Sequence, residues 1–177
     1  MKKFFIFIIL YFCMIPFISA QTNEYMLKGV FIEKFTNFIE WPKTSSVPDT
    51  TQSFVIAVLG KNSFGNILNN IYQHQKIYNK TVIIDYSPNL DQLDQYQILF
   101  IAGSEKNKLP LILKSVKGKP ILTISDTEGF AQTGVMINFY IDGDNVRFEI
   151  NENELLRSHI KVSHLLFNVA KIVSSGD

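Results

Sequence analysis

Hydrophobic side chains recur at helical spacing in residues 23–41 of the chain. Three or four residues separate most of the apolar positions, and polar residues such as Lys28 and Lys34 stand between them. The apolar positions are Leu27, Val30, Phe31, Phe35, Phe38 and Ile39. This spacing predicts one amphipathic helix with its apolar stripe turned toward a core. We expect the helix to end at Trp41, because Pro42 disfavours helical backbone in the residue before it.

Four short apolar runs follow a polar loop at residues 43–53. They are FVIAVLG at 54–60, TVIIDY at 81–86, QILFIAG at 97–103 and PILTISD at 120–126. Their hydrophobicity is continuous rather than alternating, which is typical of strands buried on both faces of a parallel sheet. Residues 63–73 and the stretch from about 110 to 116 are expected to supply two crossover helices.

The pattern changes after Asp126, where apolar and polar residues alternate along 135–141 and again after a turn. Alternation around Asp142-Gly143-Asp144-Asn145 predicts an antiparallel hairpin with one partly solvated face. Arg147 and Glu149 share one face of the second strand and are expected to pair across the hairpin.

A helical region is expected to begin after Asn151, which stands three residues before Glu154 as in a capping box. Residues 160–162 alternate like a strand, and Ser163 is placed to cap a second helix over 164–173. The chain is therefore predicted to be an α/β protein. Its three layers are a mostly parallel sheet flanked by helices, with an antiparallel hairpin near the C-terminus.

The first 20 residues stand apart from this pattern. They hold two lysines, an apolar run from Phe4 to Phe12 and small residues at Ser19 and Ala20. That order is typical of a secretory signal peptide with cleavage after Ala20. The apolar run is shorter than the roughly 20 residues that span a bilayer. The sequence thus predicts a signal peptide at 1–20 and a single domain at 21–177.

Loss of this segment leaves a chain of nearly neutral charge. Without Lys2 and Lys3, 17 basic residues become 15 against 16 acidic ones, so the formal charge moves from +1 to −1. A near-neutral chain lacks the electrostatic footprint of nucleic-acid binding. Cys13, the only cysteine, is lost as well, so neither a disulfide nor a thiol switch is expected.

The loop from Gly60 to Gly65 has two glycines at the spacing of a phosphate-binding loop. However, Asn66 and Ile67 stand where a lysine and a hydroxyl residue should follow. An ordinary turn capped by Ser63 is the main interpretation, and a weak anion site at the helix start is the alternative. Because α/β proteins bind ligands at the carboxyl ends of parallel strands, the candidate ligand-binding residues are Gly60, Ser63, Gly103 and Asp126.

No cofactor, metal or catalytic residue is expected. On one helix His159 and His164 would lie about 140 degrees apart, too far around the axis for a shared metal face. The mature chain also has no cysteine nucleophile and no Gly-x-Ser-x-Gly elbow. Asp126 and Glu128 would support a hydrolase only if they converged in a cleft, and the acidic residues at 142–145 suit a turn.

Two aromatic residues leave two interpretations open. Trp41 either closes the core beneath the 43–53 loop or is presented to a partner. Phe130, which follows Gly129, is either a plug under the end of the sheet or an exposed contact residue.

Taken together, these segments resemble the YfiR family, a bacterial secreted α/β domain also represented by HmsC. In chain order they are KGVFIEKFTNFIEWP, FVIAVLG, ILFIAG, PILTISDTEGFAQTGVMINFYIDGDNVRFEIN and IKVSHLLFNVAKIV. The positions that match family motifs are Trp41, Pro42, Gly60, Asp126, Gly129, Phe130, Gly134, Asn138, Arg147, Phe148, Asn151, Leu165 and Leu166.

The resemblance implies a periplasmic regulator and not an enzyme. Characterised relatives bind the periplasmic part of an inner-membrane diguanylate cyclase and repress it, so that release raises cyclic di-GMP and favours biofilm formation. Those relatives carry cysteines through which redox state is linked to activity. Since the mature chain has none, another input is expected here.

We therefore expect an inner-membrane partner, either a diguanylate cyclase or a sensor kinase, because the mature chain has no span of its own. Aromatic anchors often dominate interface energy, which favours a patch around Trp41 and Phe130. The candidate partner-binding residues are Trp41, Pro42, Phe130, Asn138, Arg147 and Asn151. A homodimer stays open. The alternatives are a periplasmic small-molecule-binding protein with its site at the strand ends, and a hydrolase that uses Asp126 and Glu128.

Overall fold

The structure is a computed structural model that describes residues 15–45, 47 and 52–175, with side chains from residue 23 onward. The predicted signal peptide therefore lies largely outside the described residues. The helices are α2 (Ile15–Thr36), α3 (Ile67–Tyr72), α4 (Leu109–Val116), α5 (Phe130–Thr133), α6 (Glu152–Arg157) and α7 (His164–Phe167), with 3-10 turns η1 (Leu93–Gln95) and η2 (Gly103–Lys108). The strands are β1 (Ile39–Glu40), β2 (Phe54–Leu59), β3 (Lys76–Ile77), β4 (Lys80–Asp85), β5 (Ile98–Ile101), β6 (Leu122–Ser125), β7 (Ile137–Asp142), β8 (Asn145–Asn151), β9 (Lys161–Val162) and β10 (Lys171–Val173).

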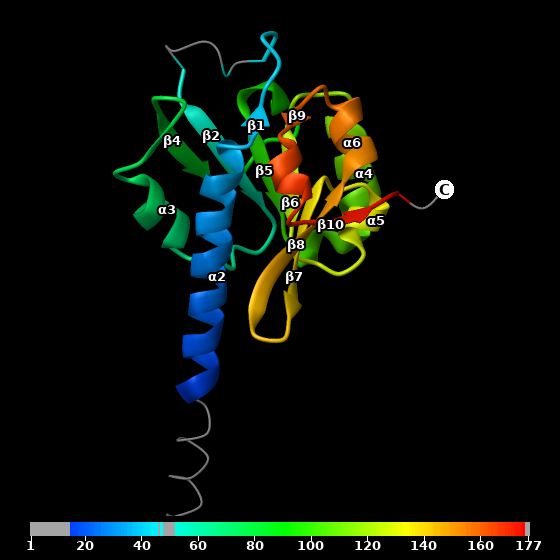
Figure 1. Cartoon of the computed structure of the whole chain (residues 1–177). Coiled ribbons are helices and arrows are strands. Elements are labelled where there is room, and N and C mark those ends of the chain that lie inside the picture. Colours follow the sequence, from blue (N-terminus) through cyan, green and yellow to red (C-terminus); the bar gives the residue numbers. More distant parts are fainter. Residues whose placement is uncertain (1–14, 46, 48–51, 176–177) are drawn as a thin grey trace, which may run out of the picture.

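Eight of these strands form one sheet in the order β10-β8-β7-β6-β5-β2-β4-β3. The strands β4, β2, β5, β6 and β7 are parallel neighbours, and β7 and β8 form an antiparallel hairpin. Helices α2 and α3 cover one face and α4 and α5 the other, which gives the three layers visible in Figure 1. The predicted α/β fold with a mostly parallel sheet and a C-terminal hairpin is confirmed.

The larger core lies between α2 and the sheet. Phe35 packs edge-on against Phe148, with ring centroids 4.9 Å apart, and stacks on Phe139 at 5.7 Å. Phe31 completes this aromatic group through contacts with Phe139 and Phe148. Burial of such rings contributes most of the stabilisation that fixes α2 on the sheet.

Two local predictions about the C-terminal half are confirmed. Asp142 pairs with Asn145 across the hairpin, and Gly143 in the turn has φ of 60°, a left-handed conformation that favours glycine. The Asn151 side chain accepts a hydrogen bond from the backbone N–H of Glu154 at 3.2 Å, so it caps α6.

The prediction that one helix continues to Trp41 is wrong. Helix α2 ends at Thr36, and Ile39 and Glu40 form the short strand β1, which pairs with β9. Pairing with a strand from the far end of the chain outweighs the local helical spacing. Leu27 and Val30 are also exposed rather than buried, because the buried face of α2 carries Lys28 in their place.

The prediction of a helix over 164–173 is correct only at its start. Ser163 caps α7 by accepting a hydrogen bond from the Leu165 N–H, as expected. The helix then ends at Phe167, and β10 joins the sheet in parallel with β8. Sheet pairing satisfies the backbone of β10, and Val169 and Ile172 are exposed.

The loop after β2 is held by Asn62 and not by Ser63. The Asn62 side chain accepts from the Phe64 N–H and donates to the Gly65 carbonyl, and α3 begins at Ile67 without a side-chain cap. An Asx turn of this kind fixes the loop without a bound anion.

Candidate functional site at the carboxyl edge of the sheet

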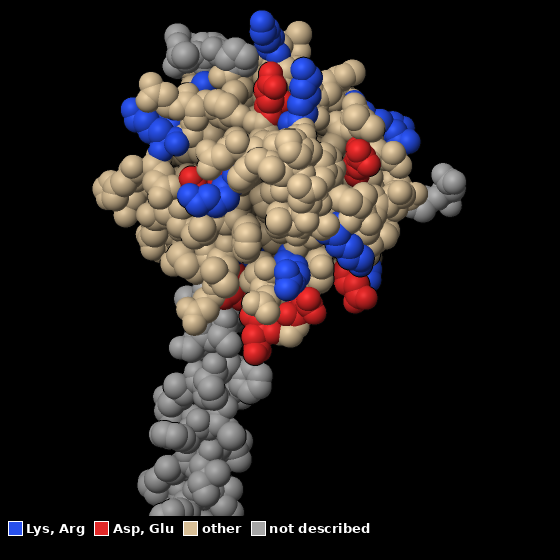
Figure 2. Space-filling model, in the orientation of Figure 1, with Lys and Arg blue, Asp and Glu red and all other residues tan. Residues whose placement is uncertain are grey.

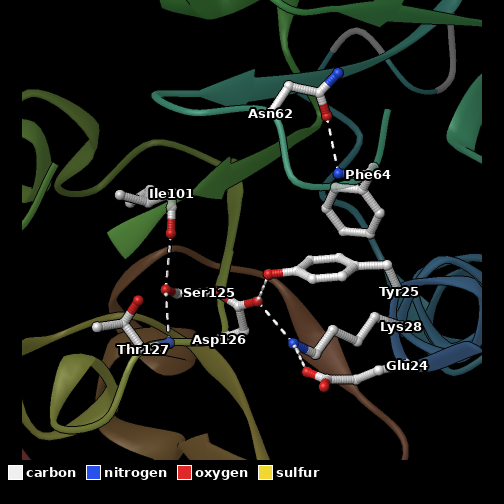
Figure 3. Close-up of polar contacts among 9 residues, drawn as sticks. All are labelled: Glu24, Tyr25, Lys28, Asn62, Phe64, Ile101, Ser125, Asp126 and Thr127. Carbon is white, nitrogen blue, oxygen red and sulfur yellow. Dashed lines mark hydrogen bonds and ion pairs between the residues drawn. The ribbon is translucent and has the colours of Figure 1, made fainter. Parts of the chain in front are cut away.

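The first described turns of α2 lie against the carboxyl ends of the central strands. Asp126 follows β6 at this edge, and its Oδ2 atom is 2.7 Å from both the Tyr25 hydroxyl and the Lys28 Nζ atom (Figure 3). Lys28 also contacts Glu24 Oε1 at 2.5 Å. We refer to Glu24, Tyr25, Lys28 and Asp126 as the α2 lock, because they join the helix to the strand end.

The α2 lock is largely shielded from water. The Lys28 side chain is 4% exposed and that of Asp126 is 10% exposed. Burial alone would lower the pKa of Lys28, but the charge of Asp126 and its hydrogen bond outweigh burial, so the pKa is raised. Burial is the largest cause that raises the pKa of Tyr25, and Asp126 raises it further. Lys28 is therefore charged and Tyr25 neutral at physiological pH.

Sequence reasoning missed Tyr25 and Lys28 as site residues. A signal was present, because Lys28 stands at the same helical spacing as Ile32 and Phe35, which are both fully buried. A lysine on the apolar stripe of a helix needs a buried carboxylate partner. Only the fold shows that the partner is Asp126, 98 residues further along the chain.

The predicted ligand residues Gly60, Gly103 and Asp126 do lie along the same edge, at the ends of β2, β5 and β6. The glycines, however, serve close packing between the edge loops. A Cβ at Gly60 would lie 2.4 Å from Ser104 Oγ, and one at Gly103 would lie 2.8 Å from Thr127 Oγ1. Ser63 contributes a hydrogen bond to Tyr25 of the α2 lock.

A row of polar side chains lies at the same carboxyl edge, on the face of the sheet opposite to α2. Ser125, Asn138, Glu149 and Lys171 are register partners on β6, β7, β8 and β10. Glu149 is 5% exposed and accepts hydrogen bonds from Asn138 at 3.3 Å and from Gln132 at 3.4 Å. The Lys171 ammonium lies 3.3 Å from Glu149 Oε2, the oxygen that also accepts from Gln132. These four residues are the polar row.

The expectation that Trp41 and Phe130 form an exposed aromatic patch is corrected by their burial. Trp41 is 5% exposed and packs edge-on against Phe54 and Tyr78, and Phe130 is 2% exposed in the core beneath α4. Both rings have a large apolar area, and leaving it in water would cost free energy. Both are therefore packed in the core.

The other proposed partner residues divide into buried and accessible ones. Asn138 and Asn151 are at most 1% exposed, so neither is accessible to a protein partner, and Asn151 donates to the Ala131 carbonyl at 2.8 Å. Arg147 is exposed and pairs across the hairpin with Asp142 at 3.1 Å, as predicted. Pro42 is half-buried. Of this set, only Arg147 and Pro42 can be reached by a partner.

Asp126 and Glu128 line one cleft, but their roles differ. Asp126 is bonded to Lys28 and Tyr25, whereas no described residue pairs with the exposed Glu128 carboxylate. Among residues 15–45, 47 and 52–175, no three His, Cys, Asp or Glu side chains are grouped so that they could hold a metal ion.

A family model described as YfiR/HmsC-like matches residues 25–171. The chain belongs to this family. The match begins at Tyr25 of the α2 lock and ends at Lys171 of the polar row, so it includes the polar row and all of the α2 lock except Glu24. Among the described residues, none of the helices has the length and hydrophobicity that a bilayer span requires.

Two solved structures are similar in fold. One is the ABC domain in complex with L-Trp from Streptococcus pneumonia, with a TM-score of 0.51 and 8% identity. The other is a ligand-free, open substrate-binding protein with adhesive properties from Clostridium difficile, with a TM-score of 0.51 and 10% identity. Each alignment covers 72% of this chain, which spans only 59% and 56% of those proteins. At this identity the likeness shows an α/β fold and nothing more.

Proposed function

We propose that this YfiR/HmsC-like protein is a periplasmic regulator, exported by a signal peptide at residues 1–20, that represses or modulates an inner-membrane signalling protein. A diguanylate cyclase is the first candidate partner, and a sensor kinase is the second. The observation that carries the proposal is the family match over residues 25–171, which spans nearly all of the described chain. Binding to such a partner would alter cyclic di-GMP levels and biofilm formation without any chemistry in this protein.

The outer face of α2 is the partner surface that we propose in place of Trp41 and Phe130. Met26, Leu27 and Val30 are 41%, 48% and 39% exposed on that face. The solvated face of a surface helix is normally polar, so three neighbouring apolar side chains indicate a contact surface. Figure 2 shows charged side chains at the upper and lower ends of this view and at mid-height on both sides, with a largely uncharged area between them.

The test is capture of membrane proteins from envelope extracts by the native protein and by Leu27→Asp. We expect the native protein to retain a cyclase or kinase, and Leu27→Asp to retain much less because a charge is placed at the centre of the apolar face. Leu111→Asp on α4 is the matched control, since Leu111 is an exposed leucine on the opposite face. Equal loss in both variants, or no cyclase or kinase retained by the native protein, would reject the proposal.

A second candidate function is binding of a small molecule at the carboxyl edge. The gathering of Gly60, Gly103 and Asp126 at the ends of parallel strands favours it, since α/β proteins place ligands there. The α2 lock occupies the carboxylate of Asp126, so a ligand at that point would have to displace Lys28 or Tyr25. Lys28→Met should then strengthen such binding in a ligand-screening assay.

A further inference from the structure

A cleft of about 590 Å³ opens beside the part of the carboxyl edge that α2 closes. Its polar lining includes Asp126, Glu128, Gln132, Asn138, Glu149 and Lys171. Asp126 is paired with Lys28 and Glu149 with Lys171, so Glu128 carries the unpaired negative charge of this lining. An acidic concave surface concentrates cations from solution.

One buried oxygen in this lining has no hydrogen-bond partner. Asn138 is 1% exposed, and its Nδ2 atom donates to Glu149 Oε1 at 3.3 Å. Its Oδ1 atom accepts no hydrogen bond from any described residue. Buried polar atoms are normally paired with protein or with an ordered molecule, so this oxygen calls for a donor from outside the chain.

The neighbouring members of the polar row do not donate to this oxygen in the structure. The Ser125 hydroxyl donates its one proton to the Ile101 carbonyl at 2.7 Å. The Lys171 ammonium is 3.3 Å from Glu149 Oε2.

One further group in the cleft suits a cation. Glu128 is exposed, and no described residue pairs with its carboxylate. The Tyr140 ring already has the Lys171 Nζ atom 5.6 Å from its centroid, so a ligand cation would lie apart from that ring.

We propose that this cleft binds a small organic ammonium compound, that is, a compact aliphatic amine. Its N–H groups donate to Asn138 Oδ1 and to the Glu128 carboxylate. Gln132, an exposed side chain that reaches Glu149 only at 3.4 Å, is the neighbouring group that rotates to admit it.

This site is independent of the membrane partner, and it deepens the second candidate function by naming a ligand class. It lies toward β7, β8 and β10 and not at the ends of β2 and β5. Partner capture tests the regulator, whereas titration of the purified protein tests this site, so the two can fail separately.

The test is a calorimetric titration in which putrescine is added to the purified native protein. Butanediol of the same chain length is the neutral control, and Mg²⁺ and Ca²⁺ are tested in parallel. We expect putrescine to bind and butanediol not to bind.

Two variants test the proposed contacts. Glu128→Gln should weaken putrescine binding by about tenfold or more, because it removes a charge-assisted hydrogen bond. Asn138→Leu should weaken it as well, with its fold checked by thermal unfolding.

Glu152→Gln is the matched control, since Glu152 is an exposed glutamate outside the cleft, and it should bind putrescine as the native protein does. Butanediol binding as strongly as putrescine, or binding of a divalent cation alone, would overturn the amine assignment. Absence of putrescine binding would overturn the site itself and leave the Asn138 oxygen to water. Loss of binding in Ser63→Ala but not in Glu128→Gln would move the ligand to the β2 end.

Discussion

The two halves of the carboxyl edge differ in how their polar groups are satisfied. On the α2 side, the buried charge of Lys28 meets Asp126 and Glu24, and the Tyr25 hydroxyl completes the group. On the β7-β8-β10 side, Glu149 has three partners, yet Asn138 Oδ1 has none. The first half is complete within the described residues, whereas the second has an acceptor that none of them satisfies. The contrast separates a half that fixes α2 on the sheet from the half where we propose a ligand.

The largest expected effect comes from removing the cation of the α2 lock. Lys28→Ala leaves the buried Asp126 carboxylate without its ammonium partner, and we expect a loss of about 3 kcal/mol in the free energy of unfolding. Urea unfolding measures it. Lys34→Ala is the control, because the Lys34–Glu33 pair is exposed and should contribute at most about 0.5 kcal/mol. Similar losses in both variants would contradict a buried lock.

The pH dependence of the free energy of unfolding tests the α2 lock further. The pKa of Lys28 is raised on folding above its ordinary 10.5, so its contribution to stability is complete below that pH. It is lost as the pH rises through the folded-state pKa, and Tyr25, whose pKa is also raised from 10.0, acts in the same direction. The difference in unfolding free energy between native protein and Lys28→Ala should therefore narrow above pH 10.5. A constant difference up to strongly alkaline pH would show that the charge does not stabilise the lock.

A smaller effect is expected for the hydroxyl of Tyr25. Tyr25→Phe keeps the edge-on contact with Phe64 but removes the hydrogen bond to Asp126, so we expect a loss of about 1 kcal/mol. Tyr140→Phe is the matched control, and chemical denaturation compares the two. The prediction fails if Tyr25→Phe is as stable as the native protein.

The smallest effect on stability is expected on the β7-β8-β10 side of the carboxyl edge. The Lys171 side chain is 59% exposed, so solvent screens its interaction with Glu149, and Lys171→Met should cost only about 0.5 kcal/mol. Equilibrium unfolding of Lys171→Met beside Lys28→Ala gives the comparison directly. If the two cost the same, the halves do not differ in the way proposed.

The sequence predicted the elements best where one periodicity dominated. The continuous apolar runs became β2, β4, β5 and β6 in a parallel array, and the Asp-Gly turn became the β7-β8 hairpin. Prediction was wrong where a segment paired with a distant one. Ile39 joined Val162, and Ile172 joined Ile150, although both segments have helical spacing. The spacing of apolar residues within a segment does not show which strand edge is available for that segment to pair with.

The candidate site was predicted only in part. Asp126 was singled out because it follows a strand, but its partners Tyr25 and Lys28 were not, since nothing local indicates that a helix of the N-terminal region crosses this edge. For Trp41 and Phe130 both a buried and an exposed position were left open, and the hypothesis of an exposed patch is wrong because the fold buries both. The local sequence around an aromatic residue beside proline or glycine does not differ between buried and exposed cases. Only the packing of other elements decides whether the ring is buried.

The sequence by itself determined the fold class, the order of the strands along the chain and the family, because apolar periodicity and turn residues act over a few neighbouring positions. Only the tertiary structure decided that Lys28 reaches Asp126 and that Asn138 lies beside Glu149 with one oxygen unpaired. These contacts join residues far apart in the chain through sheet register and helix placement. Both depend on the global packing of apolar surface, which no single segment specifies.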